Sequence, residues 1–191
     1  MTFPIWNHTG TIPSIRPGKS GHDPDRSPYK TTLNDVFDYF CSSAERLAIC
    51  RGLLEYRARL HAIGLRQGFQ WINGSFAEDV ETNEARSPGD VDVVTFFEVA
   101  PNYDMHKVAS LEPDLFDIKS VKAQYHVDGY FFQLGFPQRA NEIERVSYWY
   151  SMWSHRRDGL WKGFVQVDLD PGGDSDALDR INAIAAQMGL S

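Results

Sequence analysis

Asp90 and Asp92 are separated by one valine at the start of an apolar segment of the chain. Residues i and i+2 of a strand point to the same face, so the pattern directs both carboxylates at one place. Carboxylates this close repel each other unless a cation lies between them. Oxygen ligands of this kind suit Mg²⁺ or Mn²⁺, which makes the pair a candidate metal site. The alternative is that Asp90 completes a Pro-Gly-Asp turn and Asp92 is a solvated strand end.

Gly74 and Ser75 follow the preceding apolar segment. Glycine lets the backbone approach a ligand closely, and serine offers a hydroxyl and a free N–H. If a helix opens at Phe76, these N–H groups lie at its N-terminus, which favours phosphate. A Gly-Ser pair beside two divalent cations fits in-line phosphoryl or nucleotidyl transfer. By itself, such a pair after a strand is an ordinary turn.

Hydrophobic periodicity predicts the elements that position these residues. We expect strands over 69–73, 91–99, 122–134 and 162–169. Helices are expected after a Thr32 cap, from Ser42 (capping box with Glu45) to Gly64, over 141–153 and over 174–189, with weak helical character over 101–119. Arg51, Arg57, Arg59 and Arg66 are expected on a solvated face, with Glu45 and Glu55 as partners. The expected fold class is α/β (α+β), a mixed sheet of about four to five strands flanked by helices.

The domain organisation is expected to be simple. Residues 1–31, rich in Pro, Gly and Ser, are expected to form an extended arm, either solvated or contacting phosphate through its basic residues. Residues 32–191 are expected to form one domain, with a helical part over 32–64, a sheet core over 69–169 and a C-terminal helix over 174–189.

Composition limits the partners of this 191-residue chain. Its net charge of −7 gives no general attraction to nucleic acid or to an anionic membrane, so a long nucleic acid is the least favoured partner. The apolar runs are far shorter than the roughly 20 residues of a membrane helix, and the N-terminus does not resemble a signal peptide. Cys41 and Cys50 are expected as core thiols of a cytoplasmic protein.

Two motifs together resemble the nucleotidyltransferase signature of the DNA polymerase β superfamily. They are I-N-G-S-F, which contains Ile72, Gly74 and Ser75, and D-V-D-V-V, which contains Asp90 and Asp92. Asn73 is more polar than the residue usual before the glycine, and the spacer over 76–89 is longer than is common. The I-P-S-I-R-P-G, H-V-D-G-Y-F-F and R-D-G-L-W-K-G segments are similar to small, largely uncharacterised bacterial and phage nucleotidyltransferase-like proteins.

The resemblance implies a third metal-binding carboxylate on a neighbouring strand. Asp128 matches it best, because a lone charge among aromatic residues needs a partner, and Asp168 is the rival. His126, two residues before Asp128, is expected either beside the site or as an ordinary strand histidine. Lys162 is expected either to contact a triphosphate or to lie in a solvated turn.

The function implied is a Mg²⁺- or Mn²⁺-dependent nucleotidyltransferase. It would move a nucleoside monophosphate from an NTP to a hydroxyl of a protein, a small molecule or an RNA end. Asp90, Asp92 and Asp128 would hold the metal and carry catalysis, and Gly74, Ser75 and Lys162 would bind the nucleotide. An alternative is the same fold used for binding or regulation with a protein partner, as in a toxin-antitoxin or defence system. A metal-dependent phosphohydrolase is a third possibility.

Overall fold

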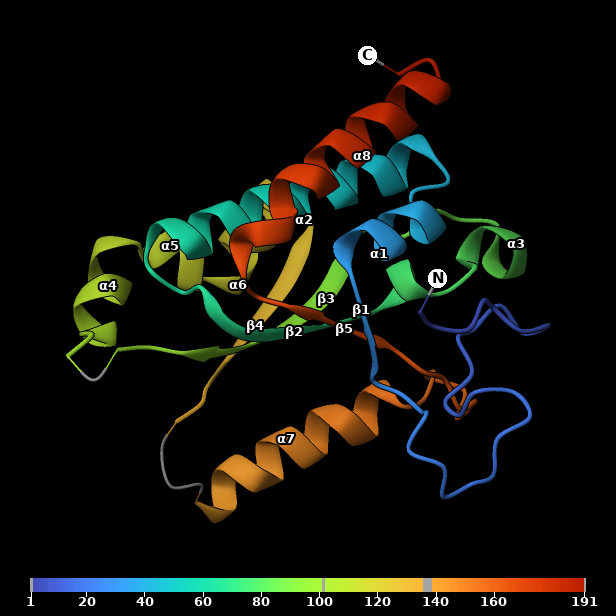
Figure 1. Ribbon diagram of the computed structural model, residues 1–191, viewed down its shortest axis with the longest axis horizontal. Helices are drawn as coiled ribbons and strands as arrows, with labels where there is room; N and C mark the ends of the chain where they lie inside the picture. Colours follow the sequence, from blue (N-terminus) through green and yellow to red (C-terminus); the bar gives the residue numbers. More distant parts are fainter. Residues whose placement is uncertain (1, 101, 136–138, 191) are drawn as a thin grey trace.

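The computed structural model describes residues 2–100, 102–135 and 139–190, which form a mixed sheet flanked by helices. The strand order is β1-β5-β2-β3-β4 (Figure 1). Strand β2 (Gln67–Asn73) pairs antiparallel with both β3 (Val91–Glu98) and β5 (Val165–Asp168). Strand β4 (Val127–Gln133) is parallel to β3, and β1 (Tyr29–Thr31) is parallel to β5. The α/β class with four to five strands is confirmed.

Helices cover the two faces of the sheet unequally (Figure 1). Helices α1 (Leu33–Phe40), α2 (Ala44–Ala62) and α8 (Asp174–Gln187) lie on one face, and α6 (Ile118–Tyr125) packs against α2. Helix α7 (Ala140–Trp153) lies on the opposite face. Because strand side chains alternate, Ile72, Val93 and Val127 join the first core, while Trp71, Val94 and Phe132 pack with Trp149 and Trp153 of α7.

Short elements connect this framework. They are the 3₁₀ helices η1 (Ser75–Ala77) and η2 (Pro171–Gly173) and the helices α3 (Val80–Glu84), α4 (Met105–Leu111) and α5 (Pro113–Phe116). Residues 1 and 191, the ends of the expected arm and domain, and Pro101, the start of the expected helical segment, lie outside the described residues. Among the described residues, no helix has the length and apolar character needed to span a membrane.

Three local predictions are wrong. The longer helix is capped by Ser43, whose side chain accepts a hydrogen bond from the N–H of Arg46, and not by Ser42. Residues 122–125 end α6 and do not begin a strand, because Asp117 caps this helix by accepting from the N–H of Ser120. His126 then reverses the chain with φ of 55°, so it does not share a strand face with Asp128.

Arg57 on α2 is another correction, because it is buried and does not lie on a solvated face. Its guanidinium pairs with Asp174 at 2.8 Å and donates to the side chain of Gln70 at 2.7 Å. The partner is therefore supplied by α8 and not by Glu45 or Glu55 of the same helix.

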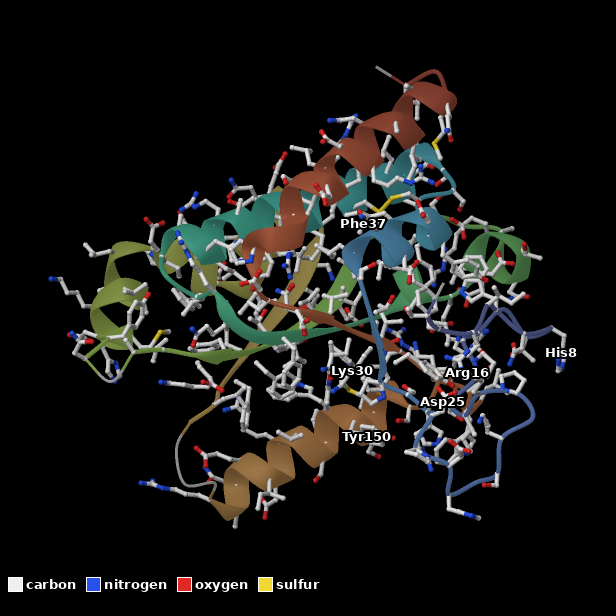
Figure 2. All side chains as sticks on the ribbon, in the orientation of Figure 1. His8, Arg16, Asp25, Lys30, Phe37 and Tyr150 are labelled. Carbon is white, nitrogen blue, oxygen red and sulfur yellow. A yellow bond between two sulfur atoms is a disulfide. The ribbon has the colours of Figure 1, made fainter. Side chains whose placement is uncertain are left out.

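The N-terminal segment packs against the domain along much of its length (Figure 2). Phe3 and Ile12 are buried, and Tyr29–Thr31 form the edge strand β1. Arg16 pairs with Asp25 at 2.6 Å, and Tyr150 of α7 donates to the carbonyl of Ser27 at 3.2 Å. The guanidinium of Arg16 is thus paired with a carboxylate of the arm itself.

Cys41 and Cys50 are joined in a disulfide, which corrects the expectation of two core thiols. Cys41 caps the end of α1, and Cys50 lies within α2. The turn between the two helices brings their Cα atoms to 6.8 Å, at the upper limit for a disulfide. Pairing across a helix corner cannot be read from helical periodicity.

Candidate functional site

The ends of three adjacent strands bring Asn73, Asp92 and Asp128 into one row. Asn73 of β2 is the register partner of Asp92 of β3, and Asp92 is the register partner of Asp128 of β4. Partners in adjacent strands present their side chains on the same face, here the face covered by α7. The row requires both the antiparallel β2–β3 pair and the parallel β3–β4 pair.

A cleft of about 830 Å³ opens over this row. Its walls are formed by the segment from η1 to β3, the ends of β2, β3 and β4, and the segment that follows α7. The predicted site residues that line it are Gly74, Ser75, Asp90, Asp92, Asp128 and Lys162. Asp168 does not line the cleft, because it is paired with Phe69, four residues before the end of β2. The structure therefore places Asp128, and not Asp168, beside Asp92.

The Gly74-Ser75 turn lies directly against Asp92. Gly74 has φ of 82°, and a Cβ atom added there would lie 2.9 Å from the carboxyl carbon of Asp92. The long spacer over 76–89 does not displace the turn, since this spacer folds into η1, α3 and a loop that returns to β3. Only one 3₁₀ turn follows Gly74, so a phosphate here would be bound by individual N–H groups and not by an α-helix dipole.

The carboxyl group of Asp92 has a strongly shifted pKa. Burial, together with the negative charges of Asp90 and Asp128, raises its pKa to about 6, against the opposing effect of Lys162 and Lys122. Asp90 lies just before β3 and not within it, yet it faces the same cleft. Three carboxylates thus lie close together in a partly buried site, where their negative charges repel one another.

Lys122 was missed by the sequence analysis, which placed it in a strand. It lies in the last turn of α6, where its ammonium forms a close ion pair with Asp90 and lies 3.6 Å from Oδ2 of Asp128. The hydrogen bond to Asp90 raises the pKa of Lys122. Helical placement of residues 118–125 is the signal that would have revealed this contact.

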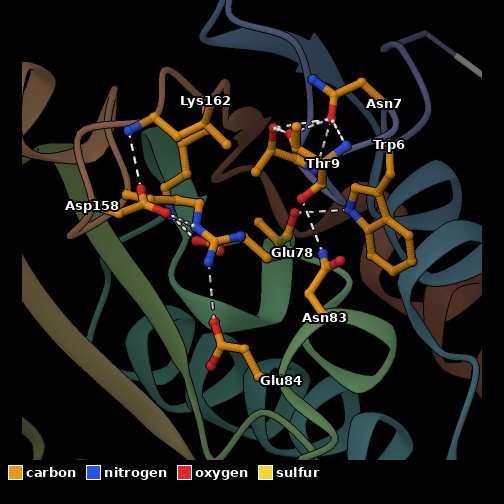
Figure 3. Close-up of polar contacts among 12 residues, drawn as sticks. Trp6, Asn7, Thr9, Glu78, Asn83, Glu84, Asp158 and Lys162 are labelled. Atoms are coloured by element: carbon orange, nitrogen blue, oxygen red, sulfur yellow. Dashed lines mark hydrogen bonds and ion pairs between the residues drawn. The ribbon is translucent and has the colours of Figure 1, made fainter.

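A second charged cluster forms the opposite wall (Figure 3). Lys162 is buried and forms an ion pair with Glu78, so it is not in a solvated turn. Arg156 lies 3.6 Å from Glu78 and 3.4 Å from Glu84. Glu78 was also missed, because its partners are 78 and 84 positions away in sequence.

The N-terminal segment is attached to both walls. Trp6 Nε1 donates to the carbonyl of Ala77 at 2.9 Å, and the N–H of Asp79 donates to the carbonyl of Gly10 at 2.9 Å. On the other wall, the N–H of Gly163 donates to the carbonyl of Ile12 at 2.6 Å. One short stretch of the arm therefore joins the wall beside η1 to the wall that contains Lys162.

The chemistry of the row fits a hard cation. Over 2–100, 102–135 and 139–190, no group of three or more His, Cys, Asp or Glu side chains is arranged to hold a metal ion. The row, however, combines two carboxylates with an amide, and Oδ1 of Asp128 is buried with no hydrogen-bond partner within these ranges. An unpaired, buried carboxylate oxygen next to a carboxyl group with a raised pKa fits Mg²⁺ or Mn²⁺.

Comparison with protein-family models finds a match over residues 4–168 to a family of unknown function (DUF6932). Comparisons with curated proteins and with solved structures gave no match.

Proposed function

Since the chain belongs to the family of unknown function DUF6932, we propose its activity from the cleft alone: metal-dependent transfer of a nucleoside monophosphate from an NTP to a hydroxyl acceptor. The observation that carries this proposal is the register of β2, β3 and β4. It sets Asp92 beside Asp128 and brings the Gly74 turn against Asp92. A phosphate-binding turn and clustered carboxylates are the two parts that this reaction requires.

Each end of the cleft has a role in the proposed reaction. The backbone N–H groups beside Gly74 and the Ser75 hydroxyl bind the β- and γ-phosphates. Lys162 adds positive charge beside them, which requires its ammonium to leave the ion pair with Glu78. Asp90, Asp92 and Asp128 would hold Mg²⁺ or Mn²⁺. When bound, the cation stabilises negative charge on the phosphate oxygens and on the leaving pyrophosphate.

The acceptor hydroxyl attacks the α-phosphorus in this proposal. Its proton passes to the carboxylate of Asp128, which lines the cleft beside Asp92. A new oxygen–phosphorus bond forms, the bond from the α-phosphorus to the bridging oxygen breaks, and pyrophosphate leaves. Lys122 must first release Asp90 and Asp128, because its ammonium lies between them.

The acceptor class follows from charge. The chain carries a net charge of −7, and the cleft is lined by several carboxylates in addition to the row. A protein side chain, a small molecule or an RNA end is favoured over a long polyanion, because six carboxylates and five Lys or Arg side chains line the cleft and leave it without a net positive charge.

One observation favours a second candidate function, a binding or regulatory protein without catalysis, for example in a toxin-antitoxin or defence system with a protein partner. Lys122 neutralises Asp90 and approaches Asp128, as a metal ion would. If Lys122 held this position permanently, the cleft would be a stable charged surface and not a catalytic centre.

Calorimetric titration of each NTP with Mg²⁺ tests the proposal. We expect binding by the natural chain and loss of binding in the Asp90→Ala/Asp92→Ala double variant. Asp168→Ala is the matched control, because it removes an aspartate that lies outside the cleft. Incubation with labelled ATP, GTP, CTP and UTP plus lysate then identifies the base and the acceptor. Equal NTP binding by the natural chain and the double variant would overturn the metal assignment.

A further inference from the structure

Asn73, the last residue of β2, has a buried side-chain amide in which only the NH₂ group forms a hydrogen bond. Its side chain is 1% exposed, and Nδ2 donates to the carbonyl of Trp153 at 3.0 Å. Oδ1 is buried and has no hydrogen-bond partner among the described residues. Because Nδ2 must face the Trp153 carbonyl, the single hydrogen bond fixes which way the amide oxygen points.

An unpaired buried acceptor is unfavourable, because folding removes its hydrogen bonds to water without replacing them. Gln70 lies on the same strand but on the opposite face of the sheet, and both polar atoms of its side-chain amide are hydrogen-bonded. Its Oε1 accepts from Arg57 at 2.7 Å, and its Nε2 donates to Thr95 at 3.0 Å. Both halves of the Gln70 amide are therefore used, whereas the oxygen of Asn73 has no partner.

The position of Asn73 indicates what its oxygen would bind. Asn73 is the register partner of Asp92, and on the other side of Asp92 lies Asp128, whose Oδ1 is also buried and unpaired. Two unpaired oxygens thus flank one carboxylate. The nearby ammonium groups are engaged elsewhere, that of Lys162 with Glu78 and that of Lys122 chiefly with Asp90.

We propose that Asn73 supplies a neutral oxygen ligand, through Oδ1, to a divalent-cation site that it forms with Asp92 and Asp128. Amide carbonyl oxygens are ordinary ligands of hard divalent cations. This inference rests on the metal site of the proposed function and adds to it a ligand that is not a carboxylate. It also gives a role to the buried polar residue that ends β2.

Electron paramagnetic resonance of free Mn²⁺, titrated into the full chain without nucleotide, tests the inference. Asn73→Leu removes the oxygen at similar volume, and Asn73→Ala is the second variant should the leucine variant fail to fold. Gln70→Leu is the matched control, because it alters a buried amide of the same strand on the other face. Circular dichroism and thermal unfolding without metal report the fold of each variant.

We expect Asn73→Leu to weaken Mn²⁺ binding by about 10-fold or more, the range found for residues that support a metal site. Asp92→Asn should abolish binding, and Gln70→Leu should lower the unfolding temperature without changing Mn²⁺ affinity. Mn²⁺ binding by folded Asn73→Leu equal to that of the natural chain would overturn the role of Asn73 and leave the proposed function standing. Absence of Mn²⁺ binding by the natural chain would overturn both.

Discussion

Gly74 and Asp92 are so close that a single methyl group cannot be placed between them. A Cβ atom on residue 74 would lie 2.9 Å from both the carboxyl carbon and Oδ2 of Asp92. Glycine is therefore required at this position for two reasons. It adopts the positive φ of 82° without strain, and its lack of a side chain leaves space for the Asp92 carboxylate. A phosphate held by this turn would lie next to a metal held by Asp92.

The first prediction concerns this contact. Gly74→Ala should weaken Mg²⁺-dependent NTP binding at least 10-fold in calorimetry, because the new methyl group displaces Asp92. It should also destabilise the fold by about 1–2 kcal/mol through backbone strain. Gly18→Ala is the control, since Gly18 has φ of 83° but nothing within 4 Å of an added Cβ. Equal NTP binding by the two variants would show that the clash is unimportant.

The second prediction separates the two candidate functions at Lys122. Lys122→Ala removes the ammonium that competes for Asp90 and Asp128, so Mn²⁺ affinity should rise severalfold if these carboxylates bind metal. Lys119→Ala, at an exposed residue of the same helix, should leave Mn²⁺ affinity unchanged. Unchanged Mn²⁺ affinity in Lys122→Ala, with the fold intact, would favour the non-catalytic function.

The third prediction concerns Arg46, a fully buried cation of α2. It pairs with Glu81 at 2.6 Å and donates at 2.6 Å to the carbonyls of Phe76 and Glu78. Arg46→Met should lower the free energy of unfolding by about 3–5 kcal/mol, because it leaves these buried acceptors unpaired. Urea denaturation measures this change.

Arg59→Met is the matched control for Arg46. Arg59 lies on the same helix but forms an exposed ion pair with Glu112, so its replacement should cost less than about 1 kcal/mol. Similar losses for the two variants would contradict a special role for the buried pair.

The fourth prediction concerns pH. Burial lowers the pKa of His61 from its usual 6.5, and the positive charges of Arg57 and Arg66 lower it further, while the hydrogen bond to the Leu169 carbonyl and the charge of Asp174 oppose the shift. The unfolded chain therefore binds more protons than the folded chain below about pH 6.5. The contribution of His61 to stability should fall as the pH decreases through this window, by about 1.4 kcal/mol for each unit of lowered pKa, while Asp92, whose pKa is raised to about 6, contributes in the opposite direction.

Urea denaturation between pH 7 and pH 5 measures this dependence. The stability of His61→Gln, which cannot titrate at this position, should rise relative to that of the natural chain as the pH falls over this interval, and His22→Gln, at an exposed side chain, is the control. An identical pH dependence in His61→Gln and the natural chain would contradict the assignment.

The sequence reveals the parts of the site that follow from local pattern. Strand alternation and the Gly-Ser turn are local, so Gly74, Ser75 and Asp92 could be identified as candidates. The third carboxylate was implied by the family resemblance, and the lone charge among aromatic residues favoured Asp128 over Asp168. Lys122 could not be found, because the aromatic residues of segment 122–134 imitate a strand while the Asp117 cap makes its first residues helical. The local pattern of apolar residues predicts the correct element only where no helix cap favours a different one.

Ion pairs between residues that are distant in the sequence could not be predicted, for a different reason. The partner of Arg57 is 117 positions away, so charges spaced along one helix suggested local partners that the fold does not use. The disulfide likewise depends on the angle between α1 and α2, which no periodicity encodes.

The arm residues from Trp6 to Ile12 add a backbone connection between the two walls of the cleft, which the ion pair of Glu78 and Lys162 also joins. The backbone amides of Asp79 and Gly163 both donate to carbonyls of this stretch, at Gly10 and Ile12. Detachment of the arm would expose both amides in one event, so they should exchange with solvent deuterium at a common rate, as members of one cooperative unit. The positions of both walls would then depend on a segment that contributes no residue to the lining of the cleft.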